Sequence, residues 1–182
     1  MPIDGDFQVE VCDWANEVDR EGLLDVREGV FVLEQHVPRE MEIDDDDPRS
    51  VHVLAGAQDG TPIGSGRLTP EGSIGRVAVL RTWRGRRVGT MLLHTLLDQA
   101  RARRLATVSI HAQRDAVPFW LRHGFASVGE EFEEAGIPHI TMRRPLDGVS
   151  EPERPSPPTP PDPVTLRATT RSEGSVMRSD VH

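Results

Sequence analysis

The sequence predicts a mixed α/β domain of the α+β class, followed by a proline-rich tail. Several short segments with alternating apolar residues are joined by turn signals, a pattern typical of hairpins. A longer segment after them has apolar residues at helical spacing. Because strands follow one another directly, the order differs from the strict alternation of a doubly wound fold. We therefore assign residues 1–147 to one folded domain and residues 148–182 to a tail.

The first 50 residues predict a strand, a helix and a long loop. Residues 7–11 alternate in polarity, and residues 14–35 carry apolar side chains at helical spacing. Gly22 and Gly29 are expected to break or shorten this helix. Residues 36–50 hold two prolines and a cluster of acids, so we expect a surface loop there.

The central part predicts a hairpin, a third strand and the main helix. Residues 51–55 and 63–68 alternate in polarity on either side of the turn Asp59-Gly60-Thr61-Pro62. A third strand is expected over residues 74–80. The apolar spacing then predicts a helix over residues 88–104, which ends in three arginines that suit its dipole.

The rest of the domain predicts one more helix and three more strands. A strand is expected over residues 106–112 and a helix over residues 114–122. The last two strands are expected over residues 125–128 and 140–143, where they form a final hairpin.

The composition narrows the classes of partner. The formal net charge is -9, and all 21 basic residues are arginine. This balance disfavours nucleic acid, whose binding depends on neutralising phosphates, and favours cationic or neutral small partners. No apolar run approaches the ~20 residues of a membrane span, and the N-terminus lacks the pattern of a secretory signal. We expect a cytoplasmic protein with no membrane role, in which Cys12 is a small buried side chain.

The composition changes at Gly148. The last 35 residues contain seven prolines among serine, threonine and arginine, with no aromatic residue. Such a segment cannot bury enough apolar surface to offset the entropy of ordering it. We therefore predict a disordered tail. Its prolines are Pro152, Pro155, Pro157, Pro158, Pro160, Pro161 and Pro163.

Residues 81–90 combine four arginines and two glycines at the start of the predicted main helix. A helix start exposes unpaired N–H groups and the positive end of the dipole, and small residues let a phosphate approach the backbone. In an acidic domain, this local positive charge favours an anionic cofactor over the alternative of a solvated basic helix entry. Other nucleotide motifs fit less well, since Gly64-Ser65-Gly66 lacks the third glycine of a dinucleotide fingerprint.

The acids at residues 44–47, with Glu40 and Glu42, raise the question of a metal site. No glycine follows at the offset that a calcium loop requires, and Pro48 interrupts the segment. The scattered histidines show no zinc spacing. We predict no metal and interpret the acids as a solvated loop that helps to attract a cationic substrate.

The strand before the arginines and the helix after them carry a recognisable pattern. Residues 74–79 are IGRVAV, Arg84-Gly85 and Gly89 follow, and Leu92-Leu93 lies in the helix. This arrangement resembles the acetyl-CoA motif of the GNAT acetyltransferase superfamily. Further segments resemble its ElaA-like branch, so that the resemblance spans residues 7–144. They are residues 32–38 (VLEQHVP), 42–44 (EID), 111–113 (HAQ), 124–125 (GF) and 134–139 (EAGIPH).

The resemblance implies a splayed, mostly antiparallel mixed central sheet flanked by helices. The pantetheine arm of acetyl-CoA would lie between the strands at residues 77–79 and 107–111, with the N–H near Val79 facing the thioester carbonyl. Amides of residues 86–90 would hold the pyrophosphate. The family usually has glycine where Arg87 stands, and the side chain there either crowds or grips the pyrophosphate. The residues expected to bind acetyl-CoA are Val77, Ala78, Val79, Arg84, Arg86, Arg87, Val88, Gly89, Thr90, Gln113 and Trp120.

An acetyl transfer to an amine needs a proton acceptor. An alkylammonium has a pKa of ~10.4, so holding it neutral at pH 7 costs roughly 4.6 kcal/mol. The candidate bases are Glu34, His36 and His139, acting directly or through water. Many relatives protonate the departing thiolate with a tyrosine just before the Gly-Phe pair. Trp120 stands there in this chain, which has no tyrosine, so either water serves or activity is weak.

The sequence thus predicts an N-acetyltransferase that moves the acetyl group of acetyl-CoA to a small-molecule or peptide amine, by direct attack in a ternary complex. The alternative is a weakly active or inactive CoA-binding regulatory domain. A third hypothesis is an adaptor whose proline-rich tail docks a partner. The open sheet of so small a domain is also compatible with a homodimer.

Overall fold

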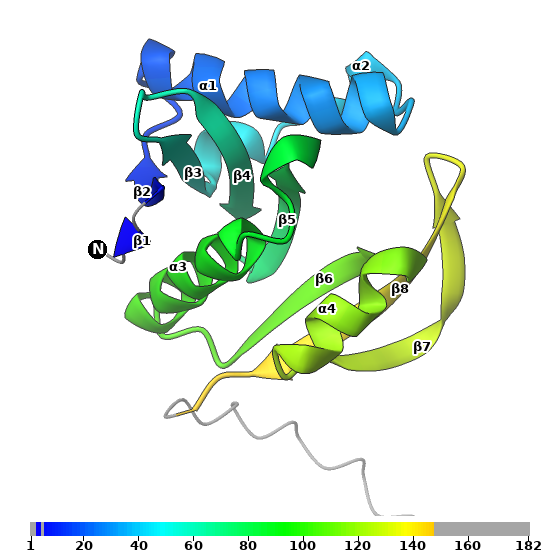
Figure 1. Cartoon of the computed structure of the whole chain (residues 1–182). Helices are drawn as coiled ribbons and strands as arrows, with labels where there is room; N and C mark the ends of the chain where they lie inside the picture. Colours follow the sequence, from blue (N-terminus) through cyan, green and yellow to red (C-terminus); the bar gives the residue numbers. More distant parts are fainter. Residues whose placement is uncertain (1–2, 5, 148–182) are drawn as a thin grey trace, which may run out of the picture. The chain divides into compact units, whose positions relative to one another are not determined.

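The computed structural model describes residues 3–4 and 6–147 (Figure 1). Its strands form one sheet in the order β1-β2-β3-β4-β5-β6-β8-β7. Neighbouring strands are antiparallel, except that β5 and β6 are parallel. The mostly antiparallel mixed sheet confirms the predicted α+β class. The strands are β1 (Ile3–Asp4), β2 (Phe7–Cys12), β3 (Val51–Ala57), β4 (Pro62–Leu68), β5 (Ser73–Val79), β6 (Thr107–Gln113), β7 (Ala126–Glu134) and β8 (Ile137–Pro145).

Residues 148–182, for which the sequence predicts a disordered tail, lie outside the described residues. Within the described part, no helix is long and apolar enough to cross a membrane. The final hairpin is longer than predicted, because β7 and β8 extend to the turn at Ala135-Gly136. The helical elements are α1 (Glu17–Arg27), η1 (Glu28–Glu34), α2 (Arg39–Glu42), η2 (Asp47–Arg49), η3 (Arg81–Trp83), α3 (Val88–Ala102), η4 (Arg114–Ala116) and α4 (Val117–Arg122).

The first long helix differs from the prediction, because neither glycine ends it. Gly22 lies inside α1, where a Cβ would come within 3.0 Å of the Leu54 side chain, so glycine allows close packing on β3. At Glu28 the chain continues as the π-helix η1, with the N–H of Gln35 bonded to the carbonyl of Val30. Helical structure therefore reaches Glu34, at the edge of the candidate site.

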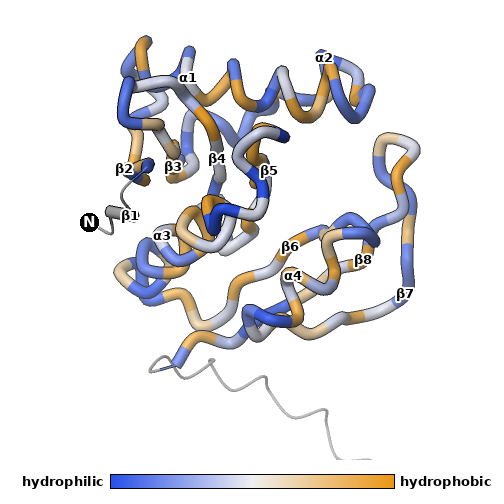
Figure 2. The backbone as a smooth tube through the Cα atoms, viewed as in Figure 1, coloured by the Kyte–Doolittle hydropathy of each residue, from blue (hydrophilic) through white to orange (hydrophobic). Residues whose placement is uncertain are grey.

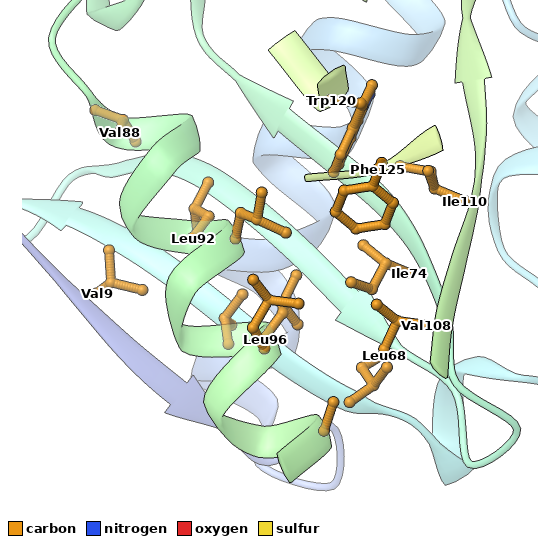
Figure 3. Close-up of a cluster of buried hydrophobic side chains, with 14 of the residues drawn as sticks. Val9, Leu68, Ile74, Val88, Leu92, Leu96, Val108, Ile110, Trp120 and Phe125 are labelled. Carbon is orange, nitrogen blue, oxygen red and sulfur yellow. The ribbon is translucent and has the colours of Figure 1, made fainter. Parts of the chain in front are cut away.

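Helices cover both faces of the sheet. On one face α3 buries Leu92, Leu93, Leu96 and Leu97 in the main core, where Figure 3 shows Leu92 and Leu96 among side chains from β5 and β6. On the other face, Val26 and Val30 from α1 and η1 pack on Ala78. Figure 2 shows hydrophobic and hydrophilic segments alternating along α3, as expected for a helix with one buried face.

Two glycines of β4 set the distance between α3 and the sheet. A Cβ at Gly64 would lie 3.0 Å from Val88 and Leu92 and 3.2 Å from the carbonyl of Ala78. A Cβ at Gly66 would lie 2.9 Å from Leu96. The two glycines of the Gly64-Ser65-Gly66 segment therefore allow the helix that begins at Val88 to pack closely against β4.

The acidic segment is not the solvated loop that the sequence predicts. Asp47 is fully buried and Glu42 is 5% exposed. Asp47 accepts hydrogen bonds from Arg27 at 2.9 and 3.1 Å and from Arg67 at 2.8 Å. Burial alone raises the pKa of Asp47, but the hydrogen bonds and charges of Arg27 and Arg67 lower it to about 2. The error arose because the arginine partners lie 20 residues away on either side.

Substituting Gly64 tests the packing of α3. We expect Gly64→Ala to lower the free energy of unfolding by about 1–3 kcal/mol, because the added methyl group meets Val88, Leu92 and a backbone oxygen. Gly56→Ala on β3 is the control, since its Cβ would meet nothing within 4 Å. Urea unfolding measures both, and equal stability of the two variants would contradict the role of Gly64.

Asp47→Asn tests the buried ion cluster. Because Arg27 and Arg67 would lose a buried counter-charge, we expect the free energy of unfolding to fall by about 3 kcal/mol. The exposed Asp45 provides the control Asp45→Asn. Since the pKa of Asp47 is lowered, its contribution is complete above about pH 4 and disappears as the pH falls toward 2. Urea unfolding across this interval should show a smaller loss of stability in Asp47→Asn than in the wild type.

Candidate active site

The parallel strands β5 and β6 separate soon after they meet. Ser73 pairs with Ser109 and Ile74 with Ile110, and no later residues of the two strands are paired with each other. Figure 1 shows the strands diverging from this point. On its other edge β5 carries a bulge opposite β4, where Arg76 has a φ of 52°. Because a bulge bends its strand, it accounts for the course of β5 away from β6.

A cavity of about 520 Å³ lies at this separation. Its walls come from β5, β6, the segment between η1 and α2, and the hairpin of β7 and β8. Four of the residues predicted to bind acetyl-CoA or to act as the base line it: Val77, Gln113, Trp120 and His139. Gln113 donates a hydrogen bond of 2.8 Å to the side-chain oxygen of Gln35, which links β6 to the end of η1.

The start of α3 lies beyond the end of β5 and has the features of an anion site. The amides of Val88, Gly89 and Thr90 have no acceptor within the helix, and no side chain caps them. Arg86 and Arg87 are exposed, and within the described residues neither forms an ion pair, although Arg86 lies 4.9 Å from the Trp83 ring centre. Arg87 adopts a φ of 67°, the left-handed region that favours glycine.

Arg84 and Glu34, predicted as a cofactor ligand and a base, are bound to each other. Two hydrogen bonds of 2.7 and 2.8 Å join the guanidinium to the carboxylate. The hydrogen bonds from Arg84 lower the pKa of Glu34. Arg84 also donates from Nε to the carbonyl of Val79 at 2.9 Å. Arg84 thus joins the end of η1 to the unpaired edge of β5.

Of the three candidate bases, only His139 lines the cavity. His36 is exposed, with a φ of 60°, and neither it nor Glu34 is among the lining residues. His139 is 7% exposed, and its Nδ1 lies 2.7 Å from the carbonyl of Ile137. Because a carbonyl only accepts, Nδ1 must donate, so Nε2 of the neutral ring carries the lone pair.

Two further residues, which the sequence analysis did not assign to the site, lie beside His139. Oε2 of Glu134 is 3.7 Å from Nε2 of His139, and Oε1 of Glu134 is 3.6 Å from Nδ1 of His111. All three side chains line the cavity. In the sheet, His139 of β8 lies between two neighbours: Gln113 of β6 is opposite it on one side, and Phe132 of β7 is opposite it on the other. Alternation along each strand predicts which side chains share a face of that strand. Only the register between strands shows that Glu134 and His111 lie beside His139.

The described residues contain no group of three or more acids, histidines or cysteines that could hold a metal ion. The polar side chains that line the cavity carry imidazole, carboxylate, amide, hydroxyl and guanidinium groups.

Comparison with known sequences identifies the chain's relatives. The family model described as "Acetyltransferase (GNAT) domain" matches residues 15–146. The chain is 37% identical over 134 residues to the uncharacterized N-acetyltransferase YjcF of Bacillus subtilis, which covers 71% of this chain and 94% of YjcF.

Solved structures lead to the same group. The crystal structure of ElaA from Escherichia coli has a TM-score of 0.68 and 30% identity, and covers 76% of this chain and 99% of ElaA. An acyl-CoA N-acyltransferase from Pseudomonas aeruginosa has the same TM-score and coverage, with 33% identity.

Arg87→Gly tests the strain at the start of α3. A left-handed non-glycine residue costs about 1–2 kcal/mol, partly offset by the flexibility that glycine adds to the unfolded chain. We therefore expect the free energy of unfolding to rise by up to about 1 kcal/mol. Arg86→Gly is the control. Arg86 has no positive φ, so glycine relieves no strain there and only adds flexibility to the unfolded chain, and we expect this variant to be less stable than the wild type. Urea unfolding would contradict this account if both variants shifted in the same direction.

Proposed function

Because this chain belongs to the GNAT acetyltransferase family, we propose that it transfers the acetyl group of acetyl-CoA to a primary amine. The observation that carries the proposal is the separation of β5 from β6, with a positive helix start at one end and a cavity at the other. This arrangement suits a long thioester with an anionic end. The names of YjcF and the Pseudomonas aeruginosa relative as N-acetyl- and N-acyltransferases support the same reaction.

The start of α3 would hold the pyrophosphate. The amides of Val88, Gly89 and Thr90 and the exposed guanidinium groups of Arg86 and Arg87 provide the donors and the charge. A Cβ on Gly89 would approach no atom closer than 3.8 Å, so the glycine is not required for protein packing and leaves room for a phosphate. Arg84 would act indirectly, since it already binds Glu34 and the Val79 carbonyl.

The edge of β5 would orient the thioester. The N–H of Leu80 bonds to Ile63 on β4, so alternation turns the N–H of Val79 toward the side of β6. We assign it as the donor to the thioester oxygen. Val77 and Trp120 line the cavity and would contact the pantetheine arm, while Trp120 also packs against Phe125 in the core.

His139 would remove the proton from the amine. Its Nδ1–H is held by the Ile137 carbonyl, which leaves Nε2 directed to accept a proton from the ammonium. Acetyl-CoA supplies the carbonyl carbon, to which the amine forms a C–N bond while the C–S bond breaks and sulfur leaves as a thiolate. Of the two protons that the ammonium gives up, one neutralises the thiolate and the other passes to water. Because the chain has no tyrosine, we assign the thiolate proton to the imidazolium of His139 or to water.

The absence of tyrosine favours a second candidate, a CoA-binding regulatory domain with little or no turnover. The two functions differ in one measurement. The enzyme releases CoA thiol when acetyl-CoA and an amine are both present, whereas the regulatory domain binds CoA tightly and releases none with any amine.

Calorimetry with CoA and thiol-release assays over a panel of amines test the proposal. We expect Arg86→Ala combined with Arg87→Ala to weaken CoA binding by about tenfold or more, because two charged donors are lost. His139→Gln should lower kcat by about 100-fold with the CoA affinity unchanged. His94→Gln, on the exposed side of α3, is the matched control. A His139→Gln variant as active as His94→Gln would exclude His139 as the base.

A further inference from the structure

The acids that line the cavity are not equivalent. Three of them are paired with arginines, so their charge is compensated within the protein. Glu134 differs, because the only charged or titratable groups it contacts among the described residues are two histidines. The paired acids are Glu42 with Arg27, Asp44 with Arg67 and Arg76, and Asp46 with Arg49.

The two arginines of the cavity wall are engaged as well. Arg67 contacts both Asp44 and Asp47, and Arg76 donates to Asp44 at 3.1 Å and to the carbonyl of Glu42 at 3.0 Å. With neutral histidines, the cavity therefore retains one uncompensated charge, that of Glu134. A single carboxylate in a partly enclosed site is complementary to a single cation.

Glu134 has free acceptor capacity. Its oxygens lie 3.6 and 3.7 Å from the nitrogens of His111 and His139, which is beyond hydrogen-bond distance. The side chain is half exposed, at the end of β7 where the hairpin turns. An ammonium hydrogen-bonded to Glu134 would also lie beside Nε2 of His139.

The rest of the cavity wall favours an apolar, uncharged body for the ligand that carries the ammonium. Phe31, Val37, Met41 and Ile137 contribute hydrocarbon surface on the side of η1, α2 and the hairpin. An additional charge on the ligand would find no unpaired partner there. A carboxylate on the carbon that bears the amine would be held close to Glu134, where like charges repel.

We propose that Glu134 binds the ammonium group of the acceptor and selects primary amines on an uncharged hydrocarbon body, without a carboxylate beside the nitrogen. This inference rests on the proposed acetyl transfer and specifies its substrate class. Glu134 is a specificity-determining residue, and His111 is a neutral neighbour whose Nδ1 lies 3.6 Å from its second oxygen. Once Nε2 of His139 has taken the proton, the adjacent carboxylate stabilises the imidazolium.

A matched pair of acceptors tests this assignment. 2-Phenylethylamine and phenylalanine differ only in the carboxylate beside the amine. With the full chain and saturating acetyl-CoA, we expect kcat/KM for 2-phenylethylamine to exceed that for phenylalanine by about 100-fold. Glu134→Gln should raise KM for 2-phenylethylamine by about tenfold or more and should reduce the preference between the two amines.

Glu133→Gln is the matched control, because it removes the same charge from the adjacent, exposed position of β7 that does not line the cavity. We expect it to leave the preference unchanged, and all three proteins to bind CoA equally in calorimetry. Equal activity of the wild type on both amines, or an undiminished preference in Glu134→Gln, would overturn the inference and leave acetyl transfer in place. Absence of thiol release with every amine tested would overturn the proposed function and this inference together.

Discussion

The separation of β5 from β6 is the constraint on which the site depends. Two strands that part inside a sheet leave N–H and C=O groups without a ladder partner, and such groups must be satisfied in another way. Arg84 satisfies the Val79 carbonyl in this way. A hydrogen bond between the side chains of Gln113 and Gln35 separately links the far end of β6 to η1. The N–H groups that stay unpaired along the edge of β5 facing β6 are available as hydrogen-bond donors to a thioester. The bulge at Arg76 bends β5, and the close packing on Gly64 places the first turns of α3 directly against β4.

Arginine has two distinct tasks in this lysine-free chain. Arg27 and Arg67 hold the acidic segment against the sheet, which converts residues 42–47 from a charged loop into one wall of the cavity. Arg86 and Arg87 remain exposed at the start of α3, where their charge is available to a ligand. Arg27 and Arg67 compensate the charge of the acids in this wall. The uncompensated charge in the cavity is therefore that of Glu134, on the β7–β8 hairpin. The positive and negative ends of the site are thus set by different elements.

Much of the fold could be predicted from local patterns. The apolar spacing of α3, the alternation along β3 and β4, and the arginines and glycines at residues 81–90 all depend on residues near one another in sequence. The predictions that were wrong concern distant partners. Asp47 resembles a solvated acid until Arg27 and Arg67 are placed beside it, and Gly22 resembles a helix breaker until the side chain of Leu54 is in contact.

The sequence by itself determined the class of fold and the family resemblance, and it predicted a phosphate site at the start of α3, because each of these rests on patterns of residues near one another in sequence. Only the tertiary structure decided which side chains share the cavity. Glu34 and His139 were equal candidates in the sequence, yet one is bound to Arg84 and the other lines the cavity beside Glu134. The reason is strand register, since the pairing of β6, β8 and β7 brings His111, His139 and Glu134 onto one face, and pairing is a property of chain segments far apart in sequence.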